Sequence, residues 1–298
     1  MTDQERRCGF VAIIGAPNAG KSTLVNRLVG AKISIVSHKV QTTRARIRAI
    51  YMHDASQVIL VDTPGIFKPR RKLDQAMVGN AWGGASEADA VVLLIDAKRG
   101  LDEEAQSILD TFKKSGIKAI LVINKIDLLP AEKLLPLSEA LNAAHDFSET
   151  FMVSAVTGSG VERLGQRLAG LMPIGPWLYP EDQTADVHLR FIAAEITREK
   201  IYERLHEELP YASTVETETW EERKDGSVKI QQAIFVARET QKAIVLGKGG
   251  HQIKLLGQLA RAEMEESFGR KVHLFLFVKV RENWAEDPER LRMMGLEL

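Results

Sequence analysis

Short apolar runs alternate with amphipathic stretches through the first 172 residues of the chain. The runs are FVAII (10–14), VILVD (58–62), AVVLLID (90–96), KAILVIN (118–124) and TFMVS (150–154). Stretches with helical periodicity, EEAQSILDTFKK (103–114) and GVERLGQRLAGLM (160–172), lie between them. Unbroken β-rich runs separated by helices indicate a sheet that is buried on both faces. The pattern therefore predicts an α/β domain with a doubly wound, mostly parallel sheet.

The pattern of hydrophobic and polar positions in the second half of the chain differs from that in the first half. A stretch with three prolines, PIGPWLYPEDQTAD (173–186), separates the halves and reads as a linker. We place a first domain at 1–173, the linker at 174–186 and a smaller α+β domain at 187–298. In that domain the pattern predicts helix 191–209, strands 212–222 and 228–237 around Asp225-Gly226, helices 239–246 and 251–267, and strand 271–280.

Composition narrows the class of protein. Forty basic and forty acidic residues balance, which argues against indiscriminate nucleic-acid binding but permits a local basic site. Cys8 is the single cysteine, so an intramolecular disulfide is excluded and a reducing compartment fits. No apolar run reaches the roughly 20 residues that span a bilayer. We expect no signal or transit peptide, a cytoplasmic location and no stable homo-oligomer.

The first candidate site is GAPNAGKS (15–22), which fits G-x-x-x-x-G-K-[ST] between a strand and a helix. Backbone N–H groups and the helix N-terminus would meet phosphate oxygens. Lys21 would neutralise the β- and γ-phosphates, and the Ser22 hydroxyl would bind Mg²⁺. The loop residues expected to contact nucleotide are Gly15, Ala16, Pro17, Asn18, Ala19, Gly20, Lys21, Ser22 and Thr23.

Three further motifs follow predicted strands. In DTPG, the Asp62 carboxylate would hold Mg²⁺ through water and the Gly65 N–H would bind the γ-phosphate. NKID indicates guanine, because a carboxylate at Asp127 accepts from N1–H and the 2-amino group, which adenine lacks. In SAVTG a backbone N–H would reach the guanine O6. The residues expected from these motifs are Asp62, Thr63, Pro64, Gly65, Asn124, Lys125, Asp127, Ser154 and Ala155.

Four motifs in this order resemble the translation-factor-related GTPases, and VQTTRAR (40–46) resembles the Q-T-T-R segment of the Era GTPase family. The resemblance covers nearly the whole chain. It implies a P-loop, Ras-like GTPase domain, a linker and an RNA-binding domain. It also implies that Thr43 is the switch threonine that binds Mg²⁺ beside Ser22 and Asp62. Thr42 is the second choice for this role. In the alternative interpretation, neither threonine binds Mg²⁺, and both are strand-forming residues that lead into a strand at 45–52.

The residue that orients water in many GTPases follows D-x-x-G, and here it is Ile66. An aliphatic side chain cannot orient water, so slow intrinsic GTP hydrolysis is expected. A partner would supply the missing group, or Asn18 would help to hold K⁺, although a turn asparagine bonded to its own backbone explains Asn18 equally well. We expect Lys21, Mg²⁺ with its ligand Thr43, and the Gly65 N–H to carry much of the catalysis.

A second glycine-lysine loop lies at Gly247-Lys248-Gly249-Gly250 between two predicted helices. G-x-x-G there is typical of a KH domain, which clamps about four nucleotides of single-stranded RNA, and the element order resembles the type II form. Five basic residues against one acid between 238 and 261 support this interpretation. A plain helix stop and start is the alternative. Expected RNA-binding residues are Arg238, Lys242, Gly247, Lys248, Gly249, Gly250 and Lys254.

The resemblance implies a GTP- and GDP-binding protein of small-subunit assembly that binds RNA near the 3′ end of 16S rRNA. An RNA-binding module with a nearly non-hydrolysing GTP site and a GTPase of RNA modification are the alternatives. The family's link to the membrane leaves peripheral contact with the inner membrane face open. The alternation in 271–280 is interpreted as core packing, with no exposed aromatic residue placed for stacking.

Overall fold

The computed structural model describes residues 5–37, 39, 42–69, 71–206, 208–293 and 296. These residues form two compact units. Among the described residues, unit 1 contains 5–34, Thr43–Asp186 and Leu296, and unit 2 contains Val187–Met293 with those of the segment Ile35–Thr42. Each unit has its own sheet and its own core, as the change of rhythm along the sequence suggests.

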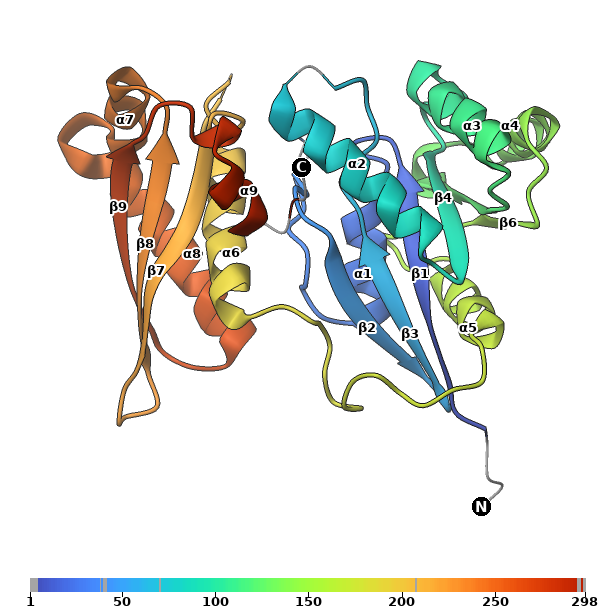
Figure 1. The fold of residues 1–298 in the computed structure, drawn as a ribbon, viewed down its shortest axis with the longest axis horizontal. Coiled ribbons are helices and arrows are strands. Elements are labelled where there is room, and N and C mark those ends of the chain that lie inside the picture. The colour runs from blue at the N-terminus through green and yellow to red at the C-terminus, as the bar shows by residue number, and fades with distance from the viewer. Residues whose placement is uncertain are drawn as a thin grey trace. The chain divides into compact units, whose positions relative to one another are not determined.

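Unit 1 is built on a six-stranded sheet in the order β2-β3-β1-β4-β5-β6 (Figure 1). Its strands are β1 (Arg7–Gly15), β2 (Ile47–His53), β3 (Ser56–Asp62), β4 (Ala90–Asp96), β5 (Ile120–Asn124) and β6 (Glu149–Met152). All neighbouring pairs are parallel except β2 and β3, which are antiparallel. The predicted doubly wound, mostly parallel sheet is confirmed. Its strand order reverses at β1, and ligands bind at such a switch point beyond the carboxyl ends of the strands.

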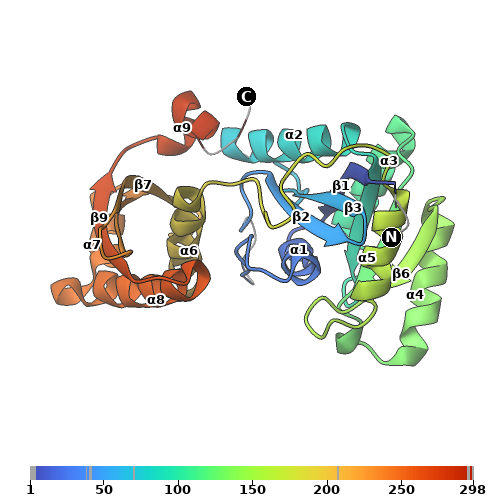
Figure 2. The ribbon, with the colours of Figure 1, turned by 90° about the horizontal axis from the view of Figure 1, so that it is seen from below.

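Helices cover both faces of this sheet (Figure 2). The helices of unit 1 are α1 (Lys21–Val29), α2 (Lys72–Ser86), α3 (Glu103–Ser115), α4 (Ala131–Ala144) and α5 (Val161–Leu171). On one face, α2, α3 and α4 bury a core that includes Phe112 and Leu141 against β1, β4 and β5. On the other face, helices α1 and α5 pack against each other, and both contact strands β2 and β3. Burial on both faces explains why the strands read as unbroken apolar runs.

Unit 2 has the predicted element order. It contains α6 (Leu189–Arg204), β7 (Ser213–Glu222), β8 (Val228–Val236), α7 (Glu239–Leu246), α8 (His251–Phe268), β9 (Val272–Val280) and α9 (Pro288–Met293). The strands pair β7-β8-β9, with β7 antiparallel and β9 parallel to β8. The parallel pair needs a crossover, and α7, the glycine-lysine turn and α8 supply it. The strand faces turned toward α6 and α8 bury Ile201, Ile234 and Leu256.

The proline-bearing stretch 174–186 groups with unit 1 and is bonded along its edge. Ile50 N donates to Thr184 O at 2.8 Å, and Asp186 N donates to Arg48 O at 2.9 Å, so the stretch follows the free side of β2. Gln57 Nε2 also donates to a carbonyl of the stretch. Edge strands present unpaired backbone groups, and this segment satisfies part of that edge. Composition marked the segment as irregular but did not reveal this pairing.

Candidate functional site

The first glycine-lysine loop lies between the end of β1 and the start of α1. Helix α1 begins at Lys21, directly after Gly20, which has a left-handed φ of 98°. A side chain at Gly20 would meet Asn124 Nδ2 at 2.3 Å, so only glycine allows this close approach. The N–H groups of the first helical turn have no partner within the helix and carry positive potential. This loop can therefore surround an anion at the carboxyl edge of the sheet.

Lys21 lies inside this loop and is buried. Its Nζ donates to the carbonyl oxygens of Gly15 (3.0 Å) and Ala16 (2.9 Å). Burial lowers the pKa of Lys21 to about 8, although the charge of Asp62 acts in the opposite direction. The ammonium group therefore lies among the backbone groups that would receive phosphate. Phosphate oxygens in that position would restore its charge and raise its pKa.

The hydroxyl and carboxyl groups needed for Mg²⁺ meet at one corner of unit 1. Ser22 Oγ and Thr43 Oγ1 are 2.9 Å apart. The Asp62 carboxyl is fully buried, and neither of its oxygens has a hydrogen-bond partner among the described residues. Burial raises the pKa of Asp62, and the nearby hydroxyls of Ser22 and Ser34 lower it. Because Mg²⁺ prefers oxygen ligands and a buried carboxylate requires a cation, these residues fit the metal.

Thr42 and Thr43 differ in where their hydroxyls point. The Thr42 hydroxyl donates to Lys39 O at 2.7 Å, whereas the Thr43 hydroxyl lies beside Ser22. The Thr43 hydroxyl therefore lies among the residues that fit Mg²⁺, whereas the Thr42 hydroxyl is bonded to the backbone three residues before it. Val40 and Gln41 of the V-Q-T-T-R motif lie outside the described residues.

The loop after β3 passes very close to the first loop. A Cβ atom on Gly65 would lie 2.8 Å from Pro17 N and Cα, so glycine is needed for this approach. The next residue, Ile66, donates its N–H to Gly15 O at 3.1 Å, while its side chain joins the apolar core. Ile66 is only 6% exposed, so its side chain faces away from any water beside a γ-phosphate.

The N-K-x-D residues connect the loops of the site. Asn124 is buried, and its Nδ2 donates to Ala19 O at 2.9 Å while its Oδ1 accepts from Ala155 N at 3.0 Å. Lys125 Nζ donates to Asn18 O at 2.6 Å and pairs with Asp96 at 2.7 Å. The Asp127 side chain is exposed in a 3₁₀ turn, Ile126–Leu128, where a base edge could reach it. Ser154 supports the last loop by accepting from Thr157 N at 3.1 Å.

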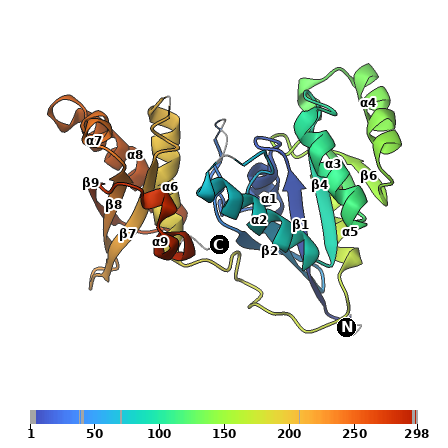
Figure 3. The same cartoon turned by 45° about the horizontal axis from the view of Figure 1, so that its top comes forward.

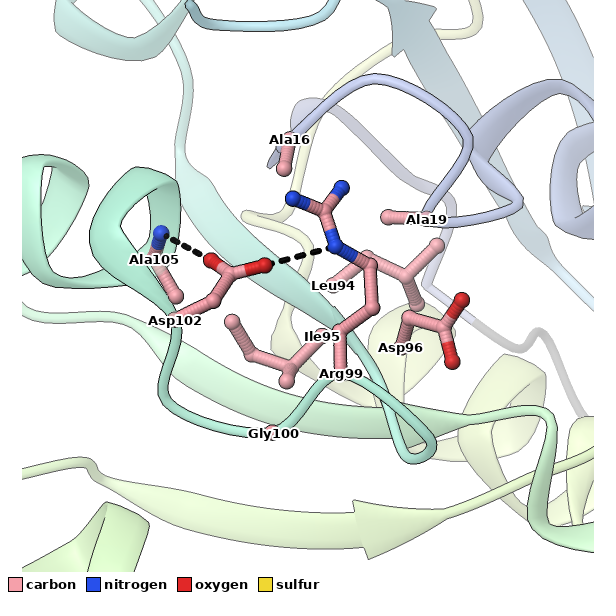
Figure 4. A pocket seen from close by; sticks show the side chains of 9 residues that line it. All are labelled: Ala16, Ala19, Leu94, Ile95, Asp96, Arg99, Gly100, Asp102 and Ala105. Atoms are coloured by element: carbon pink, nitrogen blue, oxygen red, sulfur yellow. Dashed lines mark hydrogen bonds and ion pairs between the residues drawn. The ribbon is translucent and has the colours of Figure 1, made fainter.

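Two supporting residues were missed by the sequence reasoning. Arg99, after β4, has its Nε 2.6 Å from Asp102 Oδ2 and donates from Nη1 to Pro17 O at 3.4 Å, beside a cavity of about 10 Å³ (Figure 4). Asn26, on α1, is hydrogen-bonded to the backbone of Ile33 and Ser34. Neither belongs to a nucleotide motif, so the sequence motifs gave no signal for either residue.

The second glycine-lysine loop joins α7 to α8 in unit 2 (Figure 3). Three of its residues have positive φ, namely Gly247 (71°), Gly249 (61°) and Gly250 (76°). Added Cβ atoms at Gly249 and Gly250 would meet open space, and Lys248 is exposed. The loop therefore presents backbone and one cation to the outside. Arg238, just before α7, and Lys254, on α8, are exposed as well, while Lys242 is partly buried and 3.6 Å from Glu239.

A groove of about 390 Å³ runs between α8 and β9. Lys254 and Arg261 line it together with Phe275 and Phe277. These two aromatic side chains are 46% and 47% exposed, so the expectation that this strand carries no exposed aromatic residue is wrong. The error arose because alternation shows that a strand has two faces without showing whether both are covered. The core interpretation holds for the other face, where Leu276, Val278 and Val280 pack inward.

Among the described residues, no three His, Cys, Asp or Glu side chains gather as a metal-binding group. None of the helices in the described part of the chain has the length and apolar character needed to cross a membrane.

Comparison with known proteins adds two family models and several relatives. Residues 10–125 match the model described as 50S ribosome-binding GTPase, and residues 208–285 match the model described as KH domain. A Bradyrhizobium sp. protein, GTPase Era, is 62% identical over 293 residues, which are 98% of this chain and 95% of that protein.

Two solved structures are similar over both units. One is a crystal structure of Era in complex with MgGDPNP and nucleotides 1506–1542 of 16S ribosomal RNA, with a TM-score of 0.93 and 38% identity. The other is a variant of Aquifex aeolicus Era bound to GDP·AlF4⁻, with a TM-score of 0.92 and 38% identity. Each covers 98% of this chain and 100% of the compared chain.

Proposed function

The chain belongs to the GTPase Era family and is a GTPase, and from this membership we propose that it acts in assembly of the small ribosomal subunit. In this proposal the first unit binds GTP or GDP with Mg²⁺. The KH domain of the second unit binds single-stranded RNA near the 3′ end of 16S rRNA. The main support is the whole-chain likeness to an Era structure that holds both MgGDPNP and this RNA. We place the domain boundaries at the ends of the 174–186 stretch.

The nucleotide part of the proposal is supported by the geometry of unit 1. Lys21 and the N–H groups at the start of α1 would bind phosphate oxygens, and the Gly65 N–H would bind the γ-phosphate. Ser22, Thr43 and Asp62 would hold Mg²⁺, which neutralises charge on the β- and γ-phosphates. Asp127 would select guanine, because its carboxylate finds two donors on guanine and none on adenine at those positions. The remaining nucleotide contacts are those expected from the sequence motifs.

Hydrolysis without a partner should be slow. The Ile66 side chain is buried in the core, so the position that carries a water-orienting glutamine in many GTPases has no polar group. Positioning and charge stabilisation by Lys21, Thr43 and Gly65 would then carry the reaction. A bound K⁺ near Asn18 is one proposed supplement, and a group supplied by the ribosomal partner is the other. Release of phosphate with and without K⁺ and RNA distinguishes them.

The RNA part of the proposal is supported by the loop and groove of unit 2. Backbone groups at Gly249 and Gly250 are open to a phosphate backbone, and Lys248 adds a charge. The basic residues Lys254 and Arg261 lie in the groove beside Phe277, which gives it both charge and an aromatic surface. Arg238 and Lys242 extend the basic surface along α7.

We propose that the γ-phosphate controls RNA binding through the segment 37–46. Thr43 would bind Mg²⁺ only with GTP present, which orders this segment and alters access to the RNA groove. A GTP-analogue complex in which the segment and the groove are the same as with GDP would contradict this mechanism.

The direct test is affinity for an oligonucleotide with the sequence of the 16S rRNA 3′ end, at fixed salt. Protein loaded with a GTP analogue should bind more tightly than protein loaded with GDP. A Lys248→Asp, Gly249→Asp variant should lose binding in both states. The matched control is Lys224→Asp, Gly226→Asp, which changes the same residue types in another turn, where Gly226 also has positive φ (80°). Equal loss in both variants would refute a role for the GKGG loop.

The alternative of a regulatory, nearly non-hydrolysing GTP site is favoured only by the buried Ile66. Phosphate release that stays negligible with RNA and K⁺ present would select it. We place the protein in the cytoplasm, and flotation with vesicles of anionic lipid would test contact with the inner membrane face. Gel filtration with light scattering would test the expectation that no stable homo-oligomer forms.

A further inference from the structure

Ser34 is a buried polar residue that no nucleotide motif explains. In the sequence it lies between α1 and the segment 37–46, and only 1% of its surface is exposed. Its hydroxyl has no hydrogen-bond partner among the described residues. Buried hydroxyls are nearly always paired, so a group that is missing from the protein itself is indicated as the partner.

The backbone of Ser34 is held firmly in place by Asn26. The Asn26 Oδ1 atom accepts from Ile33 N and Ser34 N, both at 2.9 Å, and its Nδ2 donates to Ser34 O at 2.7 Å. Asn26 lies four residues after Ser22 on α1, so the two side chains share one face of the helix. The clamp therefore holds Ser34 above the same helix face that presents the Ser22 hydroxyl.

The Ser34 hydroxyl also lies beside the Asp62 carboxyl. Both Asp62 oxygens and the Ser34 hydroxyl are thus buried together without a protein hydrogen bond in the described part of the chain. A shared partner would satisfy all three. Hydrated Mg²⁺ fits, because it keeps several of its waters in proteins and those waters donate hydrogen bonds.

We propose that Ser34 is a further residue of the Mg²⁺ site, where its hydroxyl bonds the metal's water beside Asp62, and that Asn26 positions it. This inference rests on the proposed Mg²⁺–guanine-nucleotide site. Ser34 does not bind the ion directly in this scheme. It sets how tightly the ion is retained, as polar groups behind the direct ligands do elsewhere.

The test is the Mg²⁺ concentration that half-maximally slows release of a fluorescent GDP analogue. In wild-type protein, any such slowing tests the proposed nucleotide site itself, separately from Ser34. In Ser34→Ala the midpoint should rise about 5-fold or more, which corresponds to the loss of about one hydrogen bond. Ser213→Ala is the matched control, because Ser213 is also buried but lies in unit 2 and its hydroxyl donates to Pro210 O at 3.3 Å, and it should leave the midpoint unchanged.

A second readout separates this role from a structural one. Without nucleotide and with a chelator present, Ser34→Ala should unfold at the same temperature as wild type or higher, because it removes a buried group that lacks a partner. The near-isosteric Ser34→Cys variant should shift the Mg²⁺ midpoint in the same direction. An unchanged midpoint in both variants, or a lower unfolding temperature without a midpoint change, would overturn the proposal.

Discussion

Substitution of Asn124 can show whether this residue holds the loops of the site together in addition to contacting the base. Its side chain joins the first loop, through Ala19 O, to the last loop, through Ala155 N. Both bonds join protein atoms only and need no atom of the nucleotide. Replacement of Asn124 by alanine should therefore destabilise the protein even before GDP is added.

The magnitude follows from what the substitution leaves unpaired. A buried carbonyl and a buried N–H each lose a partner, and an unsatisfied buried group costs about 1–3 kcal/mol. The expected loss for Asn124→Ala is thus about 2–6 kcal/mol in the free energy of unfolding. For a domain of roughly 150–250 residues, 1 kcal/mol corresponds to about 2–4 °C. The Tm should fall by at least about 4 °C and by up to about 24 °C.

The assay is thermal unfolding followed by circular dichroism, with nucleotide removed, together with GDP affinity. Asp127→Ala is the control, because Asp127 is exposed and should contribute to guanine binding only. It should lower GDP affinity strongly and leave the Tm of the nucleotide-free protein within about 1 °C, since surface substitutions rarely exceed 0.5 kcal/mol. If Asn124→Ala instead lowers affinity with an unchanged Tm, the loop-joining role is wrong.

Three further predictions concern base, phosphate and RNA. Asp127→Asn should weaken GTP binding at least 100-fold by competition assay and bind xanthosine triphosphate better, and an unchanged base preference would refute the role of Asp127. GDP binding at pH 8.5 should take up protons, because the Lys21 pKa, about 8 in the free protein, must rise beside phosphate. The proton uptake should vanish below pH 7, where Lys21 is already charged before GDP binds. Calorimetry in two buffers of different ionisation enthalpy measures this uptake. Phe277→Ala should weaken RNA binding about 10-fold through loss of stacking, and equal weakening in Leu178→Ala, an exposed apolar residue of unit 1, would argue against a specific effect.

The sequence alone was enough for the nucleotide motifs and most of the elements. Each motif sits where a strand ends, and parallel strands end at one edge of a sheet, so local patterns sufficed to bring Lys21, Asp62 and Asn124 together. Helix α7 was predicted at its observed bounds of Glu239–Leu246. Helix α6, in contrast, ends at Arg204, whereas the prediction extended it to residue 209. The prediction was too long because the helical spacing of apolar residues continues beyond the end of the helix.

Contacts that no local sequence pattern marks required the tertiary structure. The Asn26 clamp on Ser34, the approach of Arg99 to Pro17 and the pairing of 174–186 along β2 each join segments whose sequences carry no sign of one another. Likewise, the alternation in 271–280 defined two faces of β9, but only the packing of unit 2 decided that Phe275 and Phe277 stay exposed. Periodicity records which side chains share a face, and the rest of the fold determines what covers that face.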